Sequence, residues 1–221
     1  MRENQALRDS VSVTFSSVRA AGSEWELLTE DKKIFQVIKH GIEIPLVQLP
    51  QPLDLLPRGK LGPLIFIIDE SICTGAVRPL AKSKARSMKH WIPMSVVKKR
   101  DSGKSRLIYQ IEQAKHIIKP DSWKTVQELL QDPSICWDAT VDMANWFHHL
   151  ALSNKARRWA RLEVQGRAYK TAALPFGMAS SPFWAHGLSK PILEWAIAQK
   201  LTPGLYVNNV LILGKSAQEV E

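Results

Sequence analysis

Residues 204–214, GLYVNNVLILG, contain two short apolar runs separated by a pair of asparagines. Asparagine tolerates the positive φ angles of a tight turn, and the flanking runs are rich in residues that favour strands. The stretch therefore predicts an antiparallel hairpin with Asn208 and Asn209 as its turn. Its antiparallel pairing is the first constraint on the fold.

Other segments upstream repeat this pattern. Residues 91–111 have strand-like runs on both sides of a turn at 101–103, with basic residues near the tip, and residues 158–174 turn at Gln165-Gly166. The stretch ICWDATVDM alternates like a strand that ends at Asp142. The order of strand, hairpin, helix and hairpin, with antiparallel pairs throughout, predicts an α+β fold.

Three helices are expected. The first covers residues 29–41, where Thr29 caps the start, Gly41 ends the helix and an apolar stripe forms one face. The second covers residues 120–132, and the third starts at Ser181-Pro182 and bends at Pro191. The apolar stripe of the first is Ile34, Phe35, Val37 and Ile38. The side chains that the third should bury are Trp184, Leu188, Ile192, Leu193, Ala196 and Ile197. Residues 44–63 contain five prolines and should be extended and irregular.

The formal net charge of +9 is concentrated in two clusters. The first contains Lys82, Lys84, Arg86, Lys89, Lys98, Lys99, Arg100, Lys104 and Arg106, opposed only by Asp101. The second contains Lys155, Arg157, Arg158, Arg161, Arg167 and Lys170, opposed only by Glu163. A single cluster is typical of a solvated surface, whereas two favour a polyanionic partner such as nucleic acid.

Cysteine content and hydropathy exclude several classes of protein. Cys73 and Cys136 are far apart and lack the spacing of a disulfide framework or a zinc site, which indicates a reducing compartment. No signal peptide is apparent, and the longest apolar run, at residues 64–68, is too short to span a bilayer. We expect a soluble, intracellular chain, in either nucleus or cytoplasm, without a membrane partner.

Four motifs resemble the fingers and palm of retroelement reverse transcriptases, closest to those of LTR and tyrosine-recombinase retrotransposons. They are VVKKRDSGKSRLI, VDMANWFHH, GRAYKTAALPFGMASSP and YVNN, in the family's order and spacing over roughly residues 90–214. The resemblance implies an RNA-directed DNA polymerase fold, with α+β fingers and palm, an antiparallel palm sheet backed by helices, and no thumb. The implied division is an N-terminal extension at 1–60, fingers at 61–119, palm at 120–150, a second fingers hairpin at 151–177 and further palm at 178–221.

The resemblance also implies the site. Active relatives join nucleotides through two Mg²⁺ or Mn²⁺ ions, and Asp142 matches the first metal-binding aspartate. Template-primer, RNA or DNA, and deoxynucleoside triphosphate would be the partners. The matching nucleotide-binding positions are Lys99 and Arg106 for the triphosphate, Phe147 beneath the sugar, Phe176 and Gly177 on the nucleotide and templating base, and Tyr206 before the turn.

The pattern breaks where the family has two aspartates, because Asn208 and Asn209 stand in their place. An amide keeps the shape and loses the charge, so we predict a catalytically inactive site. Further departures are Gln110, Glu112 and Lys115 after the fingers hairpin, and Trp146, whose ring should crowd the nucleotide pocket.

Several alternatives stay open at this point. Asp142 also suits a turn or cap, and the basic residues also suit an ordinary surface. The pair His148-His149 is expected to pack rather than bind metal, because neighbours on a strand face opposite sides. Instead of a disabled polymerase, the chain could be a non-catalytic nucleic-acid-binding or structural protein, or an unrelated α+β domain. The oligomeric state is not predicted.

Overall fold

The computed structural model describes residues 18, 21–44, 61–81, 92, 94–98, 105–109 and 127–220. The helices among them are α3 (Gly22–Leu28), α4 (Lys32–His40), α5 (Leu61–Cys73), α8 (Trp146–His149), η1 (Ala156–Arg158), α9 (Ser181–Ala198) and α10 (Ala217–Val220). The strands are β1 (Val77–Pro79), β2 (Met94–Lys98), β3 (Ser105–Tyr109), β4 (Trp137–Asp142), β5 (Arg161–Val164), β6 (Arg167–Thr171), β7 (Thr202–Tyr206) and β8 (Asn209–Gly214).

The strands form three antiparallel sheets, in the orders β1-β6-β5, β2-β3 and β4-β8-β7. All three predicted hairpins are confirmed, since β2 pairs with β3, β5 with β6 and β7 with β8. Gln165 and Gly166 both have positive φ, of 51° and 71°, as a two-residue type I′ turn requires. The antiparallel α+β prediction is therefore confirmed.

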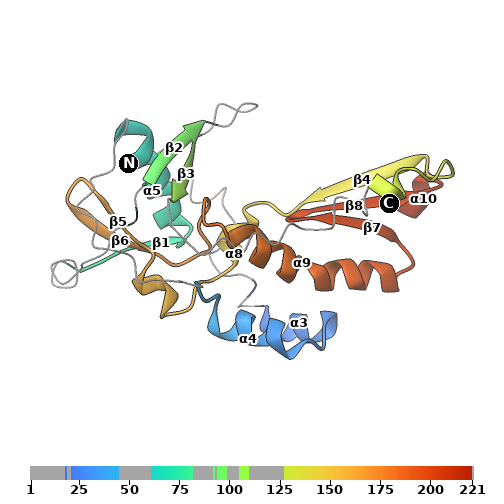
Figure 1. Ribbon diagram of the computed structural model, residues 1–221, viewed down its shortest axis with the longest axis horizontal. Coiled ribbons are helices and arrows are strands. Elements are labelled where there is room, and N and C mark those ends of the chain that lie inside the picture. Colours follow the sequence, from blue (N-terminus) through green and yellow to red (C-terminus); the bar gives the residue numbers. More distant parts are fainter. Residues whose placement is uncertain are drawn as a thin grey trace.

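The molecule is elongated, with two lobes joined near α8 (Figure 1). One lobe holds α5 and the sheets β1-β6-β5 and β2-β3, and the other holds the sheet β4-β8-β7 with α9 lying along it. Helices α3 and α4 lie below both, and α3 contacts α9.

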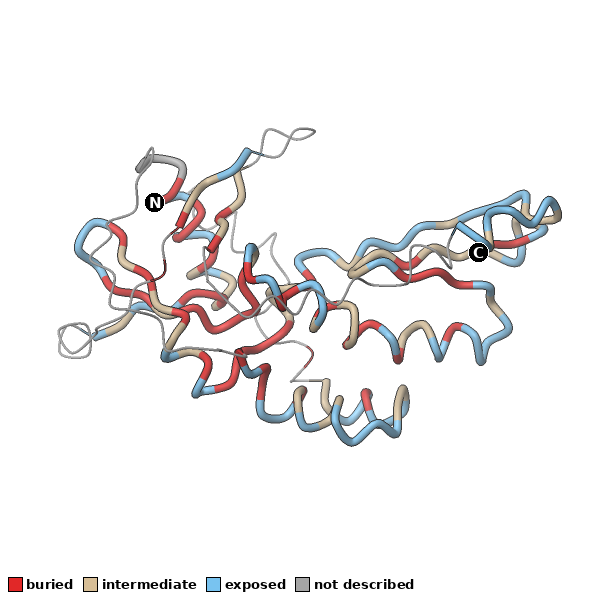
Figure 2. The backbone as a smooth tube through the Cα atoms, viewed as in Figure 1, coloured by how far each residue is buried: buried red, intermediate tan, exposed pale blue. Residues whose placement is uncertain are grey.

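Burial is concentrated in the first lobe and at the junction, as the colours in Figure 2 show. Leu152, Leu162 and Leu174 are fully enclosed, at 0 % exposure. Residue Ile42, which follows α4, joins this core as a short parallel bridge to Leu152. Part of the predicted N-terminal extension therefore belongs to the hydrophobic core.

A glycine at the end of α4 allows the chain to approach the backbone of Leu152 and Ser153 closely. Gly41 has a φ of 88°, and a Cβ there would lie 2.6 Å from the backbone nitrogen of Ser153. Ser153 donates this N–H to the carbonyl of Ile42, and Ile42 in turn donates to the carbonyl of Ala151. Gly41 thus ends α4, as predicted, and also permits the bridge.

Two helix boundaries differ from prediction. Helix α4 is capped by Asp31, whose carboxylate accepts from the Lys33 N–H at 2.7 Å, whereas Thr29 accepts from the Asp31 N–H. Thr29 lies two residues before the N-cap position and does not cap the helix. Residues 61–63, expected to be extended, form the start of α5. Of the predicted helix at 120–132, residues 120–126 lie outside the described residues and 127–129 are helical.

Helix α9 begins at Ser181 as predicted, and two of the six side chains predicted to be buried, Leu188 and Ala196, are buried. Ala185, Leu188, Ser189 and Ala196 are buried, whereas Ile197 is 55 % exposed. Trp184, Ile192 and Leu193 are only partly buried. Small residues line the buried face because α8 and β7 approach the helix closely, and this approach was not visible in the apolar pattern.

Strand β4 is the most exposed strand of the second lobe. Trp137 and Val141 are 51 % and 52 % exposed, and the edge of β4 opposite β8 is unpaired among the described residues. Within the described ranges, no helix combines the length and the hydropathy that a membrane span requires.

Candidate functional site

The candidate site is built around the turn between β7 and β8. Strand β8 lies between β4 and β7, and its first residue, Asn209, pairs with Asp142 on one side and with Tyr206 on the other. Residues paired in this way present their side chains on the same face of a sheet. The structure therefore brings Asp142, Asn209 and Tyr206 together, as the motif resemblance implied.

The turn itself is Val207-Asn208, so the prediction of Asn208-Asn209 is wrong by one residue. Val207 has a φ of 57°, the pattern of a type II′ turn, although the left-handed region costs a non-glycine residue roughly 1–2 kcal/mol. Local preference would put asparagine there. Two tertiary hydrogen bonds fix the observed register instead.

These bonds attach the turn to its neighbours. The Ser189 hydroxyl of α9 lies 2.9 Å from the carbonyls of both Val207 and Ala185, and it shares its one hydrogen between them. The Met143 N–H, just after β4, donates to the carbonyl of Asn208 at 2.9 Å. The turn is thus held from both sides, by α9 and by the end of β4.

A side-chain bond completes the contact between strand end and turn. The Asn208 Nδ2 donates to Asp142 Oδ1 at 2.5 Å. The sequence indicated that an amide replaces a carboxylate here, but not that the amide would bind the remaining carboxylate. The only available signal was chemical, since asparagine carries donors that aspartate lacks.

The donor set around the turn does not fit two divalent cations. Hard cations require several oxygen ligands, most of them anionic. Asp142 is the one carboxylate at this turn, and Asp138 lies four residues back along β4, about 13 Å away at roughly 3.3 Å per residue. The described residues contain no group of three or more histidine, cysteine, aspartate or glutamate side chains that could hold a metal.

A second group of predicted residues surrounds the ring of Phe176. The Arg106 guanidinium carbon lies 4.6 Å from the centre of this ring, in cation–π geometry. The Phe147 ring packs against it at 4.8 Å between centroids, tilted by 41°. The structure therefore brings Arg106, Phe147 and Phe176 into one cluster, and Lys99 lies outside the described residues.

The loop that carries Phe176 is fixed to β3. The Tyr109 N–H donates to the Phe176 carbonyl at 2.8 Å, and Tyr109 is buried, which raises the pKa of its hydroxyl to about 12. Gly177 follows with a φ of 89°, and a Cβ there would lie 2.6 Å from the Tyr109 carbonyl oxygen. Only glycine allows this approach.

Trp146 does not crowd an exposed pocket, so that expectation is corrected. Its side chain is 7 % exposed and belongs to the core, and its indole N–H donates to the carbonyl of Ala185 at 3.1 Å. The ring packs α8 against α9. The predicted departures Gln110, Glu112 and Lys115 lie outside the described residues.

His148 and His149 lie in the helix α8, not on the strand that was expected. The rings of His148 and Phe176 are arranged edge to face, with 5.8 Å between their centroids. The Nε2 atom of His149 lies 3.1 Å from the Ala144 carbonyl oxygen. Burial, and to a smaller extent the neighbouring His149, lower the pKa of His148 to about 4. The packing interpretation agrees with these contacts.

We expect His148 to make the stability of the chain depend on pH. The folded state keeps His148 neutral down to about pH 4, whereas the unfolded state takes up a proton below about pH 6.5. Stability should therefore fall by about 2 kcal/mol between pH 6.5 and pH 4, allowing for partial exposure.

Urea unfolding at pH 7 and pH 5 measures this change. In His148→Gln the loss on acidification should shrink, whereas His40→Gln, at the exposed end of α4, should keep the loss of the unaltered chain. An equal loss in all three proteins would contradict the assignment to His148.

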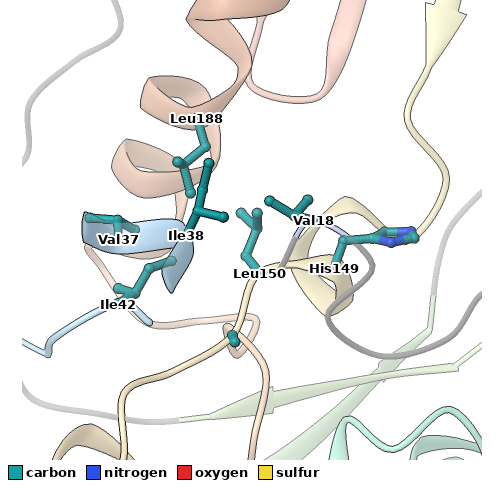
Figure 3. A pocket seen from close by; sticks show the side chains of 8 residues that line it. Val18, Val37, Ile38, Ile42, His149, Leu150 and Leu188 are labelled. Atoms are coloured by element: carbon teal, nitrogen blue, oxygen red, sulfur yellow. The ribbon is translucent and has the colours of Figure 1, made fainter. Parts of the chain in front are cut away.

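A small apolar hollow lies away from both groups of predicted residues (Figure 3). Ile38 and Ile42 of the α4 segment, Leu188 of α9 and Leu150 line it, and it has room for about one water molecule. It is a packing gap between α4 and α9 rather than a ligand site.

Comparisons with known proteins support the fold alone. Neither a family model nor a curated protein matches the chain. Among solved structures, the chain is similar to the protease-reverse transcriptase of prototype foamy virus, with a TM-score of 0.58 and 15 % identity. The match covers 97 % of this chain and 30 % of the viral protein, so the chain spans about a third of that structure. The chain therefore has the α+β fold of a reverse transcriptase fingers and palm region.

Proposed function

We propose that the chain is a reverse transcriptase-like domain that does not transfer nucleotides and binds RNA or DNA through its basic surface. One observation carries the proposal. In a fold similar to that of a reverse transcriptase, the turn beside Asp142 presents two amides, and one of them is bonded to the single carboxylate.

The loss of catalysis follows from charge. In active relatives two metal ions stabilise the attacking and leaving oxygens, and carboxylates hold these ions. Asn208 and Asn209 supply no formal charge, and Asp142 Oδ1 already accepts a hydrogen bond. Mg²⁺ or Mn²⁺ would meet one carboxylate here, whereas a two-metal site requires several.

The second basic cluster forms the proposed nucleic-acid-binding surface. Its residues surround η1 and the β5-β6 hairpin, and Lys155, Arg158 and Arg167 are exposed. Glu163 is the single acidic residue among them. Clustered cations of this kind bind phosphates through counterion release, largely without regard to base sequence.

Deoxynucleoside triphosphate is the second proposed ligand, at Arg106. Its guanidinium lies over the ring of Phe176, which also packs against Phe147. A guanidinium offers a fork of N–H donors that suits phosphate oxygens. Lys99 follows β2 in the sequence and lies outside the described residues, so its contact with the triphosphate is proposed from the motif alone.

We expect the nucleic-acid affinity to depend on the second basic cluster. Arg158→Gln/Arg167→Gln removes two exposed charges there, and each lost phosphate contact should lower the slope of log affinity against log salt by about 1. Fluorescence anisotropy with a labelled primer-template, from 50 to about 200 mM salt, measures the slope.

A matched control removes the same charge elsewhere. Lys190→Gln/Lys215→Gln changes two exposed lysines of the second lobe, on α9 and after β8, and should leave the slope nearly unchanged. Equal losses in both double variants would indicate a diffuse effect of net charge. No binding by the unaltered chain at low salt would refute the proposed function.

A further inference from the structure

The contact between Asn208 and Asp142 has a defined polarity. A carboxylate only accepts hydrogen bonds, so the amide atom 2.5 Å from Asp142 Oδ1 must be the nitrogen. The neighbouring backbone bond has the opposite direction, because the Met143 N–H donates to the Asn208 carbonyl. The turn and the end of β4 are thus joined twice, once by side chains and once by main chain.

This polarity is the opposite of what a cation needs. A divalent ion shared by positions 142 and 208 would face oxygen from both residues. Here the hydrogens of the Asn208 amide point at Asp142 Oδ1. Binding an ion would require the amide to turn over and the hydrogen bond to break, in exchange for one neutral oxygen ligand.

We propose that the Asn208 amide takes the place of a divalent cation. It holds Asp142 against the turn by donating a hydrogen bond, so that the turn is attached to the end of β4 without a metal ion. Replacing this donor by a carboxylate would place two acceptors in contact and make this attachment depend on a divalent cation. This proposal rests on the same Asn208–Asp142 bond as the proposed loss of nucleotide transfer, and it is independent of the proposed nucleic-acid binding.

Asn208 carries this role rather than Asn209. Asn209 is a strand residue that meets Asp142 through the pairing of β4 with β8, and six residue pairs form that ladder. Asn208 lies in the turn. It contacts the end of β4 through the hydrogen bond from its side-chain amide to Asp142 and through the backbone hydrogen bond from Met143. A change at position 208 should therefore act on the turn, with the ladder kept.

Thermal unfolding of the whole chain tests the proposal. In EDTA, Asn208→Asp should lower the melting temperature by about 4–8 °C, since a lost charged hydrogen bond and a new like-charge contact act together. Millimolar Mn²⁺ should restore at least half of this loss. Asn208→Ala removes the bond without adding charge and should lose about half as much, with no recovery in Mn²⁺.

The matched control is Asn154→Asp, which adds the same charge at an exposed turn before η1. Its melting temperature should be equal in EDTA and Mn²⁺. Recovery by Mn²⁺ in Asn154→Asp or Asn208→Ala as large as in Asn208→Asp would overturn the proposal, because the effect would then be unspecific.

Direct Mn²⁺ binding keeps the test decisive even if Asn208→Asp does not fold. Electron paramagnetic resonance should show the same weak Mn²⁺ binding for the unaltered chain and for Asp142→Asn. A site in the unaltered chain that is lost in Asp142→Asn, with at least a tenfold change in affinity, would overturn the proposal.

Discussion

Replacing Gly177 by alanine is expected to destabilise the chain by about 3 kcal/mol or more, because two costs combine at this position. Gly177 has a φ of 89°, which a side chain disfavours by roughly 1–2 kcal/mol. The added Cβ would also lie 2.6 Å from the Ile108 side chain and from the Tyr109 carbonyl oxygen. The second contact is with backbone of β3, which cannot move without disturbing its pairing with β2.

Thermal unfolding measures the effect, with an expected fall of roughly 6–12 °C for a chain of this size. Gly166→Ala is the matched control, since Gly166 has a φ of 71° but open space around it. The control isolates the conformational cost and should lose about 1 kcal/mol. Equal losses at the two positions would show that close packing on β3 contributes nothing.

The same substitution should weaken the cluster around Phe176. Gly177 allows Phe176 to accept the Tyr109 N–H, and this bond sets the distance between the Phe176 ring and Arg106 on the same hairpin. The contact of Arg106 with Phe176 therefore depends on the glycine that follows Phe176.

Strand pairing was predictable from the sequence because local signals and final fold agree. The Gln165-Gly166 turn and the strand that ends at Asp142 follow from residue preferences over a few positions. The same holds for the start of α9, where a serine precedes a proline. In each of these elements, the preferred local structure is also the one that the packing requires.

The turn register could not be predicted, because bonds from distant residues decide it. Ser189 and Met143 hold the turn at Val207-Asn208, against the preference of valine for negative φ. Two such bonds, at about 1 kcal/mol each, are enough to offset the cost of that φ. The burial of Ala185 and Ser189 on α9 was missed for a related reason, since the carbonyl of Ala185 accepts from Trp146, which lies 39 residues earlier.

The sequence predicted which residues of the candidate site lie near one another, and not how they are bonded. Asp142 lies next to Asn208 and Asn209, and Arg106 and Phe147 contact Phe176. The roles of these residues and of Lys99 stay predictions. The hydrogen bond between Asn208 and Asp142 depends on which amide atom faces the carboxylate, and no sequence pattern specifies that orientation.

Primer extension by the unaltered chain is expected to stay at background in Mg²⁺ and in Mn²⁺. At an effective dielectric constant of about 20, one lost charge contact near 4 Å corresponds to about 4 kcal/mol. If all of this energy is lost from the transition state, the rate falls roughly a thousandfold. Two charges are missing, at positions 208 and 209, and the remaining Asp142 is bonded to an amide.

The direct measurement compares the unaltered chain with Asn208→Asp/Asn209→Asp on one labelled primer-template, in Mg²⁺, in Mn²⁺ and in EDTA. Our account predicts no extension by the unaltered chain under any of the three conditions, and metal-dependent extension above that level once both carboxylates are present. Clear metal-dependent extension by the unaltered chain would contradict the account, because two amides at the turn would then suffice for nucleotide transfer.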